Sequence, residues 1–281
     1  MISLLYCGNE KVFKGLLISA LSIAENTEEA LDVHVLTMDL REENPAFRPI
    51  NTAQAKFIEA ALQKENSESR VVLHDATELF RKMMADSPNM ENFYTPYAFL
   101  RLFADEIEGM PERIIYLDTD TVARGDISPL FAFDLCGCDY AGAKDFLGKF
   151  FINPRYINSG VLLLNIKQIR KSGLFRKARM FCATKKTAFP DQDAINRLVS
   201  RKCFFPSRFN EQYAVRKDTV VRHFSKTLRL FPFFHTINVK PWDIDGIHKK
   251  FKTHEFDEII YKCLALAEEF EKQHYEERQT I

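Results

Sequence analysis

Short apolar runs alternate with amphipathic stretches along the first two-thirds of the chain, which is the pattern of βαβ units around a mostly parallel sheet. Ile2–Cys7 predicts the first strand, and apolar residues recur at helical spacing over Phe13–Glu25. Later apolar runs predict strands at Leu31–Thr37, Arg70–His74, Arg113–Leu117, Tyr140–Lys144, Gly160–Asn165 and Val220–His223. Further helices are predicted at Gln54–Lys64, at Asp191–Val199, and from Thr95-Pro96 through Phe103.

The last part of the chain carries one apolar stripe at helical spacing. Its members are Phe256, Ile259, Ile260, Cys263, Leu264, Ala267 and Phe270. The opposite face is rich in glutamate, which argues against adhesion to an anionic membrane and favours docking onto the protein's own body. Since no repeat or linker interrupts the chain, we expect an α/β domain over residues 1–245, with a mixed, mostly parallel sheet flanked by helices, and a helical appendage over residues 246–281 packed on it.

The charge balance and the composition of the chain exclude some classes of function. The 39 basic residues balance the 39 acidic ones, so no positive field is available to hold nucleic acid. The N-terminus lacks a basic region and a cleavage site typical of a signal peptide, and no apolar run is long enough to span a membrane. We therefore expect a cytoplasmic protein with at most peripheral contact with the inner face of the membrane. Its oligomeric state is not predicted.

The six cysteines are scattered and form no C-x-x-C pair. Cys136-Gly137-Cys138 could bind a metal but lacks a second pair of ligands. We therefore expect free, buried thiols in a reducing compartment.

A short acidic turn follows the predicted strand Arg113–Leu117. Asp118 and Asp120 lie one residue apart at the carboxyl end of this strand, which is where open α/β sheets bind ligands. Two such carboxylates can face one hard cation, which in turn can bridge the oxygens of a diphosphate. The D-x-D pattern also occurs at Asp191/Asp193 and Asp243/Asp245, but only the first pair follows a buried strand.

Five segments, taken in order, resemble the glycogenin-like family-8 retaining glycosyltransferases, and among them the bacterial enzymes that build lipopolysaccharide and other surface saccharides. They are Arg113-Ile-Ile-Tyr-Leu-Asp118-Thr-Asp120, Tyr97-Ala-Phe-Leu-Arg101-Leu, Tyr156-Ile-Asn158-Ser-Gly160-Val-Leu-Leu-Leu-Asn165, Pro190-Asp191-Gln192-Asp193 and Val239-Lys240-Pro241-Trp242. The resemblance implies the nucleotide-diphospho-sugar transferase fold, so that residues 1–245 would form the nucleotide-sugar-binding catalytic domain. It also implies a UDP-sugar donor, a saccharide acceptor that can be lipid-linked, and a Mn²⁺ or Mg²⁺ cofactor.

The resemblance assigns the metal to Asp118, Asp120 and a histidine. His223 ends a predicted strand, as the family's histidine does, whereas His235 has nearly the family's spacing from Lys240. We favour His223 and keep His235 as the alternative. The segment between His223 and Lys240 departs from the family because it contains no glycine.

The other roles are also implied by resemblance. The donor would contact Cys7, Asn9, Arg101, Asp118, Thr119, Asn158, Ser159 and Lys240. Gln192 and Asp191 would lie nearest the reacting carbon, Gln192 stabilising positive charge on the sugar ring and Asp191 binding its hydroxyls. Because an amide is a poor nucleophile, the resemblance favours front-face substitution over a covalent intermediate. The aromatic segment at residues 146–156 could contact the acceptor.

Two other functions stay open from the sequence. A nucleotidyltransferase of related architecture would also use paired acids and a metal, but Gly8-Asn9-Glu10-Lys11 is not its usual glycine-rich basic loop. A protein that binds saccharide or nucleotide without turnover would keep the fold and not the chemistry.

Overall fold

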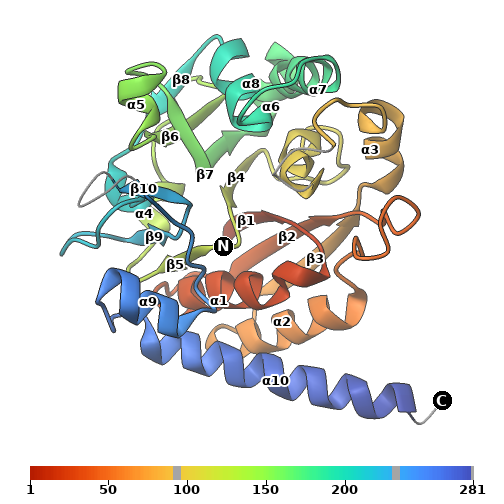
Figure 1. The fold of residues 1–281 in the computed structure, drawn as a ribbon, viewed down its shortest axis with the longest axis vertical. Helices are drawn as coiled ribbons and strands as arrows, with labels where there is room; N and C mark the ends of the chain where they lie inside the picture. The colour runs from red at the N-terminus through yellow and green to blue at the C-terminus, as the bar shows by residue number, and fades with distance from the viewer. Residues whose placement is uncertain (91–95, 230–234, 280–281) are drawn as a thin grey trace.

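The computed structural model describes residues 1–90, 96–229 and 235–279, and it is built on one seven-stranded sheet (Figure 1). The strands, in spatial order, are β3 (Arg70–Asp75), β2 (Leu31–Thr37), β1 (Ile2–Cys7), β4 (Arg113–Leu117), β7 (Ile157–Asn165), β6 (Tyr140–Lys144) and β8 (Lys202–Phe204). Neighbouring strands are parallel except where β7 pairs with β4 and with β6. The predicted fold class, a mixed and mostly parallel sheet, is confirmed.

Helices cover both faces of this sheet. One layer contains α1 (Phe13–Ala24), α2 (Thr52–Glu65), α9 (Ile244–Phe251) and α10 (Asp257–Gln279). The other contains α3 (Thr77–Met84), the 3₁₀ helix η2 (Pro96–Phe103), α6 (Ile166–Ser172), α7 (Leu174–Thr184) and α8 (Pro190–Leu198). In β4, Ile115 and Leu117 pack into the first layer, and Ile114 and Tyr116 into the second. A strand that is buried on both faces is apolar throughout, which is why β4 could be predicted from a continuous apolar run in the sequence.

Short elements complete the chain. Two small sheets pair β5 (Thr121–Ala123) with β9 (Val221–His223) and β10 (Thr227–Arg229) with β11 (His235–Ile237). The short helices are η1 (Glu10–Val12), α4 (Ser128–Phe131), α5 (Gly148–Phe151) and η3 (Ser207–Phe209).

The helix predicted from Thr95-Pro96 through Phe103 is present from Pro96 onward as the 3₁₀ helix η2, a type that the pattern did not specify. Tyr97, Leu100 and Phe103 recur every three residues, which is the 3₁₀ repeat, and all three are buried. Thr95, the predicted cap, lies outside the described residues.

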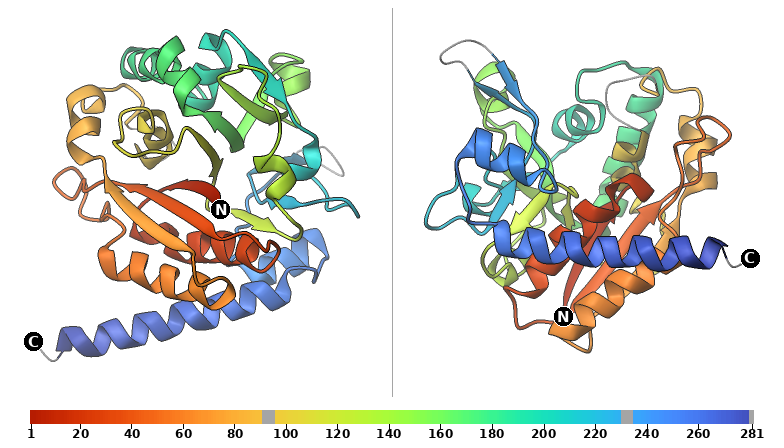
Figure 2. Two further views of the ribbon diagram at one scale, coloured as in Figure 1. Left: turned by 180° about the vertical axis from the view of Figure 1, so that it is seen from behind. Right: turned by 60° about the horizontal axis from the view of Figure 1, so that its bottom comes forward.

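The C-terminal helix α10 lies across α1 and α2, as the two views of Figure 2 show. Phe270 packs its ring 5.0 Å from the rings of both Phe13 in α1 and Phe57 in α2. The expected division at residue 245 falls inside α9. Within the described residues, no helix combines the length and the apolar character needed to cross a membrane.

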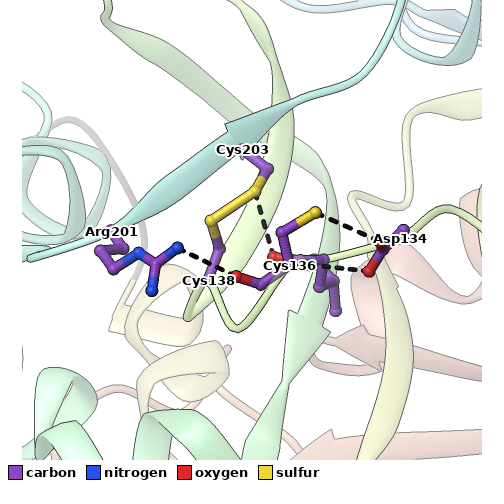
Figure 3. The surroundings of a disulfide bond; sticks show 6 residues. Asp134, Cys136, Cys138, Arg201 and Cys203 are labelled. Atoms are coloured by element: carbon purple, nitrogen blue, oxygen red, sulfur yellow. Dashed lines mark hydrogen bonds between the residues drawn. A yellow bond between two sulfur atoms is a disulfide. The ribbon is translucent and has the colours of Figure 1, made fainter.

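The prediction of free thiols is wrong for one pair, because Cys138 and Cys203 form a disulfide (Figure 3). A turn with positive φ at Cys136 (47°) and Gly137 (71°) brings Cys138 beside β8, which carries Cys203. The partners are 65 residues apart in sequence, so spacing could not reveal them. Cys136 remains a free, exposed thiol that hydrogen-bonds to Asp134.

Candidate active site

The acidic turn is anchored to the centre of the sheet. Asp118 directly follows β4, and its N–H donates to the carbonyl of Gly160 in β7 at 2.8 Å. The N–H of Thr121 donates back to the carbonyl of Asp118. The carbonyl of Thr119 lies against α1 so closely that a Cβ added at Gly15 would come within 2.5 Å of it. The Asp118-Thr119-Asp120 backbone is therefore held by β7 on one side and α1 on the other.

His223 lies beside both carboxylates because β9 pairs with β5, which places His223 opposite Thr121. Its Nε2 is 3.1 Å from Oδ1 of Asp120 and 3.5 Å from Oδ2 of Asp118. Its Nδ1 is 3.1 Å from the side-chain oxygen of Asn210. Since one imidazole nitrogen is engaged by Asn210, the other is directed at the carboxylates.

This cluster fits a divalent cation. One oxygen from Asp118, one from Asp120 and one nitrogen of His223 lie within 4.8 Å of one another. Buried Oδ1 of Asp120 faces this cluster, where it contacts the imidazole of His223. Carboxylate oxygens and a neutral imidazole suit Mn²⁺, and the oxygens suit Mg²⁺. His235 lies in β11 with an exposed side chain and does not join this cluster.

Lys240 closes the other side of Asp120. Its Nζ lies 2.5 Å from Oδ2 of Asp120, and its side chain is 32% exposed. Burial by itself would raise the pKa of Asp120, but the neighbouring His223 and Lys240 side chains outweigh it and hold that pKa well below its ordinary value. Asp120 is therefore ionised and ready to bind a cation. Trp242, two residues on, packs against Gly15.

Arg101 forms the floor of the site. Its Nη2 lies 3.0 Å from Asp118 and its Nε 3.2 Å from Asp191, while Nη1 donates to the carbonyl of Ser159 at 2.6 Å. The ring of Tyr116 stacks below the guanidinium at 4.1 Å. Burial opposes the charge of Arg101, but the surrounding acidic groups outweigh it and raise its pKa. Every guanidinium nitrogen has a protein partner, so Arg101 holds the carboxylates in position.

Asp191 and Gln192 begin α8, at the edge of the same cluster. Burial raises the pKa of Asp191, and Arg101 offsets only part of that effect. The Oε1 of Gln192 accepts hydrogen bonds from the backbone N–H of Ser159 at 2.8 Å and from its hydroxyl at 3.1 Å. The carbonyl oxygen expected to face the sugar ring is thus directed at Ser159 in this structure.

Asn158 links the site to two residues that the sequence did not reveal. Its Oδ1 accepts from the side chain of Asn210 at 3.0 Å, and its Nδ2 donates to Asp145 at 2.9 Å. Asp145 directly follows β6, which lies antiparallel to β7 as β4 does, so Asp145 and Asp118 end at the same edge of the sheet. The position of Asp145 at the end of a predicted strand could have identified it from the sequence as a candidate site residue. Asn210 lies in an irregular segment and gave no such signal.

Cys7 is the last residue of β1, and Asn9 lies in the short loop that follows it. Burial raises the pKa of the Cys7 thiol; Arg101 lowers it and Asp118 raises it, because both lie nearby. Asn9 is buried and caps η1, its Oδ1 accepting from the N–H of Lys11. Cys7 is therefore close to the cluster, and Asn9 shapes the loop beside it.

The aromatic segment at residues 146–156 divides into packed and exposed members. Phe146 stacks on Tyr213 with ring centroids 4.3 Å apart, and buried Tyr156 donates its hydroxyl to Asp193. Phe150 and Phe151 are 73% and 76% exposed.

Comparison with known proteins bears on the chemistry of this cluster. Residues 3–246 match glycosyl transferase family 8. A lipopolysaccharide 1,2-glucosyltransferase of Escherichia coli strain K12 is 31% identical over 173 residues, which are 55% of this chain and 51% of that protein. A lipopolysaccharide 1,3-galactosyltransferase of Salmonella typhimurium strain LT2 is 25% identical over 245 residues, which are 79% of this chain and 67% of that protein. The chain thus spans about half the length of the glucosyltransferase that it matches.

A solved structure shares the architecture. The galactosyltransferase LgtC, in complex with donor and acceptor sugar analogues, superposes with a TM-score of 0.66 at 18% identity, covering 93% of this chain and 96% of that one. At this identity the likeness concerns the fold.

Proposed function

Because this chain belongs to glycosyl transferase family 8, we propose that it transfers a hexose, glucose or galactose, from a UDP-sugar to a saccharide acceptor with retention of configuration. The observation that carries the proposal is the cluster of Asp118, Asp120 and His223 at the carboxyl end of β4. Oδ1 of Asp120 is buried and faces the other two groups, so two carboxylates meet where a cation would offset their charge.

We infer that these three residues hold Mn²⁺ or Mg²⁺. A cation held there would supply Lewis-acid chemistry, offsetting the negative charge on the departing nucleoside diphosphate. Lys240 would add a second positive charge at the same place, because its partly exposed ammonium can reach the diphosphate from Asp120. Arg101 would keep Asp118 and Asp191 oriented. The contact between Arg101 and the donor that the resemblance implies stays a prediction.

Retention is part of the proposed reaction, and the groups near the expected position of the sugar favour one route to it. A covalent route would need a free carboxylate there. Asp191 is paired with Arg101, and Asp193 accepts from Tyr156, so both carboxylates are engaged. The remaining group, Gln192, is an amide. This arrangement supports front-face substitution, in which the leaving phosphate helps to deprotonate the acceptor hydroxyl and Gln192 and Asp191 position the ring.

The donor would span the cluster, with the base beside Cys7 and Asn9, the diphosphate at Thr119 and Lys240, and the sugar near Asn158 and Ser159. The acceptor would be a saccharide, free or lipid-linked. The names of the relatives favour a surface saccharide such as lipopolysaccharide.

Thermal denaturation with a panel of nucleotides and nucleotide sugars, each with Mn²⁺ or EDTA, tests the donor assignment. A ligand at 100 times its Kd stabilises the folded protein by about 2.7 kcal/mol, which corresponds to roughly 5 °C in Tm for a chain of this size. We expect this rise with UDP and one UDP-hexose, in Mn²⁺ only. A protein that no nucleoside diphosphate stabilises would belong to a non-catalytic branch of the family.

A pair of alanine variants identifies the third ligand. His223→Ala should weaken Mn²⁺ binding at least about tenfold, because a protein ligand is lost, whereas His235→Ala should leave it unchanged. The electron paramagnetic resonance signal of free Mn²⁺ measures both affinities. If the two variants bind Mn²⁺ equally well, neither histidine is the ligand.

A further inference from the structure

A cavity of about 590 Å³, separate from the Asp118–Asp120–His223 cluster, lies between the segment before β7, the end of α8 and the start of β8. Three of its lining residues are cationic: Arg155, Arg197 and Lys202. None of the described residues that line it carries a carboxylate. Its remaining polar lining is neutral and includes Asn153 and Asn196. The cavity therefore gathers three positive charges that no carboxylate in its lining neutralises.

These three cations lack the close carboxylate partners that buried Arg101 and Arg179 have. Arg155 and Arg197 are exposed, and Lys202 is half-buried. Arg101 and Arg179 each contact two carboxylates. In the described part of the chain, Arg155 and Lys202 form no ion pair, and Arg197 reaches Asp193 only at 3.9 Å. Lys202 donates to the side-chain oxygen of Asn196 at 2.7 Å, so its one short contact is to a neutral group. Burial, with a contribution from Arg155, lowers the pKa of Lys202 to about 8.

The cavity is joined rigidly to the proposed active site. Asn196 lies one turn after Gln192 in α8, and its side chain brackets Ile157, accepting from its N–H at 2.8 Å and donating to its carbonyl at 2.8 Å. Ile157 directly precedes Asn158. Tyr156 and Asn196 of the cavity wall are thus tied to the strand that presents Asn158.

The rim of the cavity on the α5 side is apolar and exposed. Phe150, Phe151 and Ile152 are 73%, 76% and 50% exposed, and Ile152 also lines the cavity. Aromatic side chains pack well against the apolar C–H face of a sugar ring, whereas a charged group gains nothing from such an apolar surface. The surface thus combines an anion site with a place for a neutral ring.

We propose that this cavity binds an anionic group, phosphoryl or carboxylate, carried by the saccharide acceptor away from the hydroxyl that receives the hexose. The inference rests on the proposed transferase function. In the proposed function, the donor's diphosphate already has its partners in Lys240 and in the cation that Asp118, Asp120 and His223 would hold, so the second anion site serves the other substrate. Guanidinium and ammonium groups bind phosphoryl and carboxylate oxygens through short, charge-assisted hydrogen bonds, which a neutral sugar cannot form with the same strength.

The test compares glucose 6-phosphate, glucuronate and glucose as probes, titrated without donor and followed by NMR of the probe. We expect wild-type protein to bind one of the two anionic probes at least about tenfold more tightly than glucose. The double variant Arg155→Gln/Lys202→Gln should lose that advantage. A matched control, Lys171→Gln/Arg176→Gln, removes the same charge from exposed positions on α6 and α7 and should retain it. The tighter probe identifies the anionic group.

Equal binding of all three probes by the wild type would overturn the proposal. So would unchanged binding in the Arg155→Gln/Lys202→Gln variant, or an equal loss in the control. If the double variant does not fold, Arg155→Gln alone carries the test, because this side chain is exposed. Metal-dependent release of UDP from the donor reports the proposed function separately, and the cavity variant should keep it.

Discussion

Asp118→Asn is expected to lower turnover at least about 10³-fold, which corresponds to about 4 kcal/mol of lost transition-state stabilisation. The amide keeps the shape of the side chain but removes the negative charge that a divalent cation requires. The free energy of unfolding should change by no more than about 1 kcal/mol, because Arg101 keeps its contacts with Asp191 and Ser159.

UDP release and thermal unfolding measure the two parts of this prediction. Asp245→Asn is the matched control, since Asp245 belongs to another D-x-D pair but is exposed in the first turn of α9. The control should retain full turnover. A fully active Asp118→Asn protein would rule out the metal assignment.

Gly160→Ala is expected to disable the site although it replaces none of the candidate metal ligands. A Cβ at Gly160 would come within 2.0 Å of Cε1 and 2.7 Å of Nε2 of His223, so the imidazole must move. Displacing it should weaken Mn²⁺ binding and turnover by about 10- to 100-fold, as the loss of a group that orients a ligand does. The clash should also lower the free energy of unfolding by about 1–3 kcal/mol.

Gly125→Ala provides the matched comparison for this change. A Cβ at Gly125 meets nothing nearer than 3.8 Å, although Gly125 lies beside Val220, next to the same β9 strand. Mn²⁺ affinity and the free energy of unfolding are measured for both variants, and Gly125→Ala should leave both quantities close to those of the wild type. Normal Mn²⁺ binding by a folded Gly160→Ala protein would show that the position of His223 is not critical.

The sheet and the acidic turn could be predicted because their signals are local. The strand β4 is buried on both faces, so its residues form a continuous apolar run, and the acids come directly after it. Predicted bounds at Leu31–Thr37 match β2, where Leu31, Val33 and Val35 alternate with Asp32 and His34.

The sequence left His223 and His235 as alternatives because the answer depends on a non-local pairing. The strand β9 spans only Val221–His223, and it is the antiparallel pairing with β5 that brings His223 to Asp120. Periodicity does not encode such a contact. The partner of His223, Asn210, lies in a segment without a regular repeat, and the Cys138–Cys203 disulfide joins residues far apart in sequence.

Gly160 illustrates a different limit. The resemblance marked it as part of a motif, but only the structure gives the reason, which is that the imidazole of His223 occupies the space of its missing side chain. Spacing likewise did not identify the type of η2, because residues at intervals of three satisfy both α- and 3₁₀-helical patterns over so short a length.

The most direct test of the central claim is the release of UDP from UDP-glucose and UDP-galactose by the purified protein, with Mn²⁺ and with EDTA. We predict slow hydrolysis of one donor in Mn²⁺, none in EDTA, and none by the Asp118→Asn variant in either condition. Equal UDP release by wild type and Asp118→Asn, or release that persists in EDTA, would contradict a metal-dependent transferase centred on Asp118, Asp120 and His223.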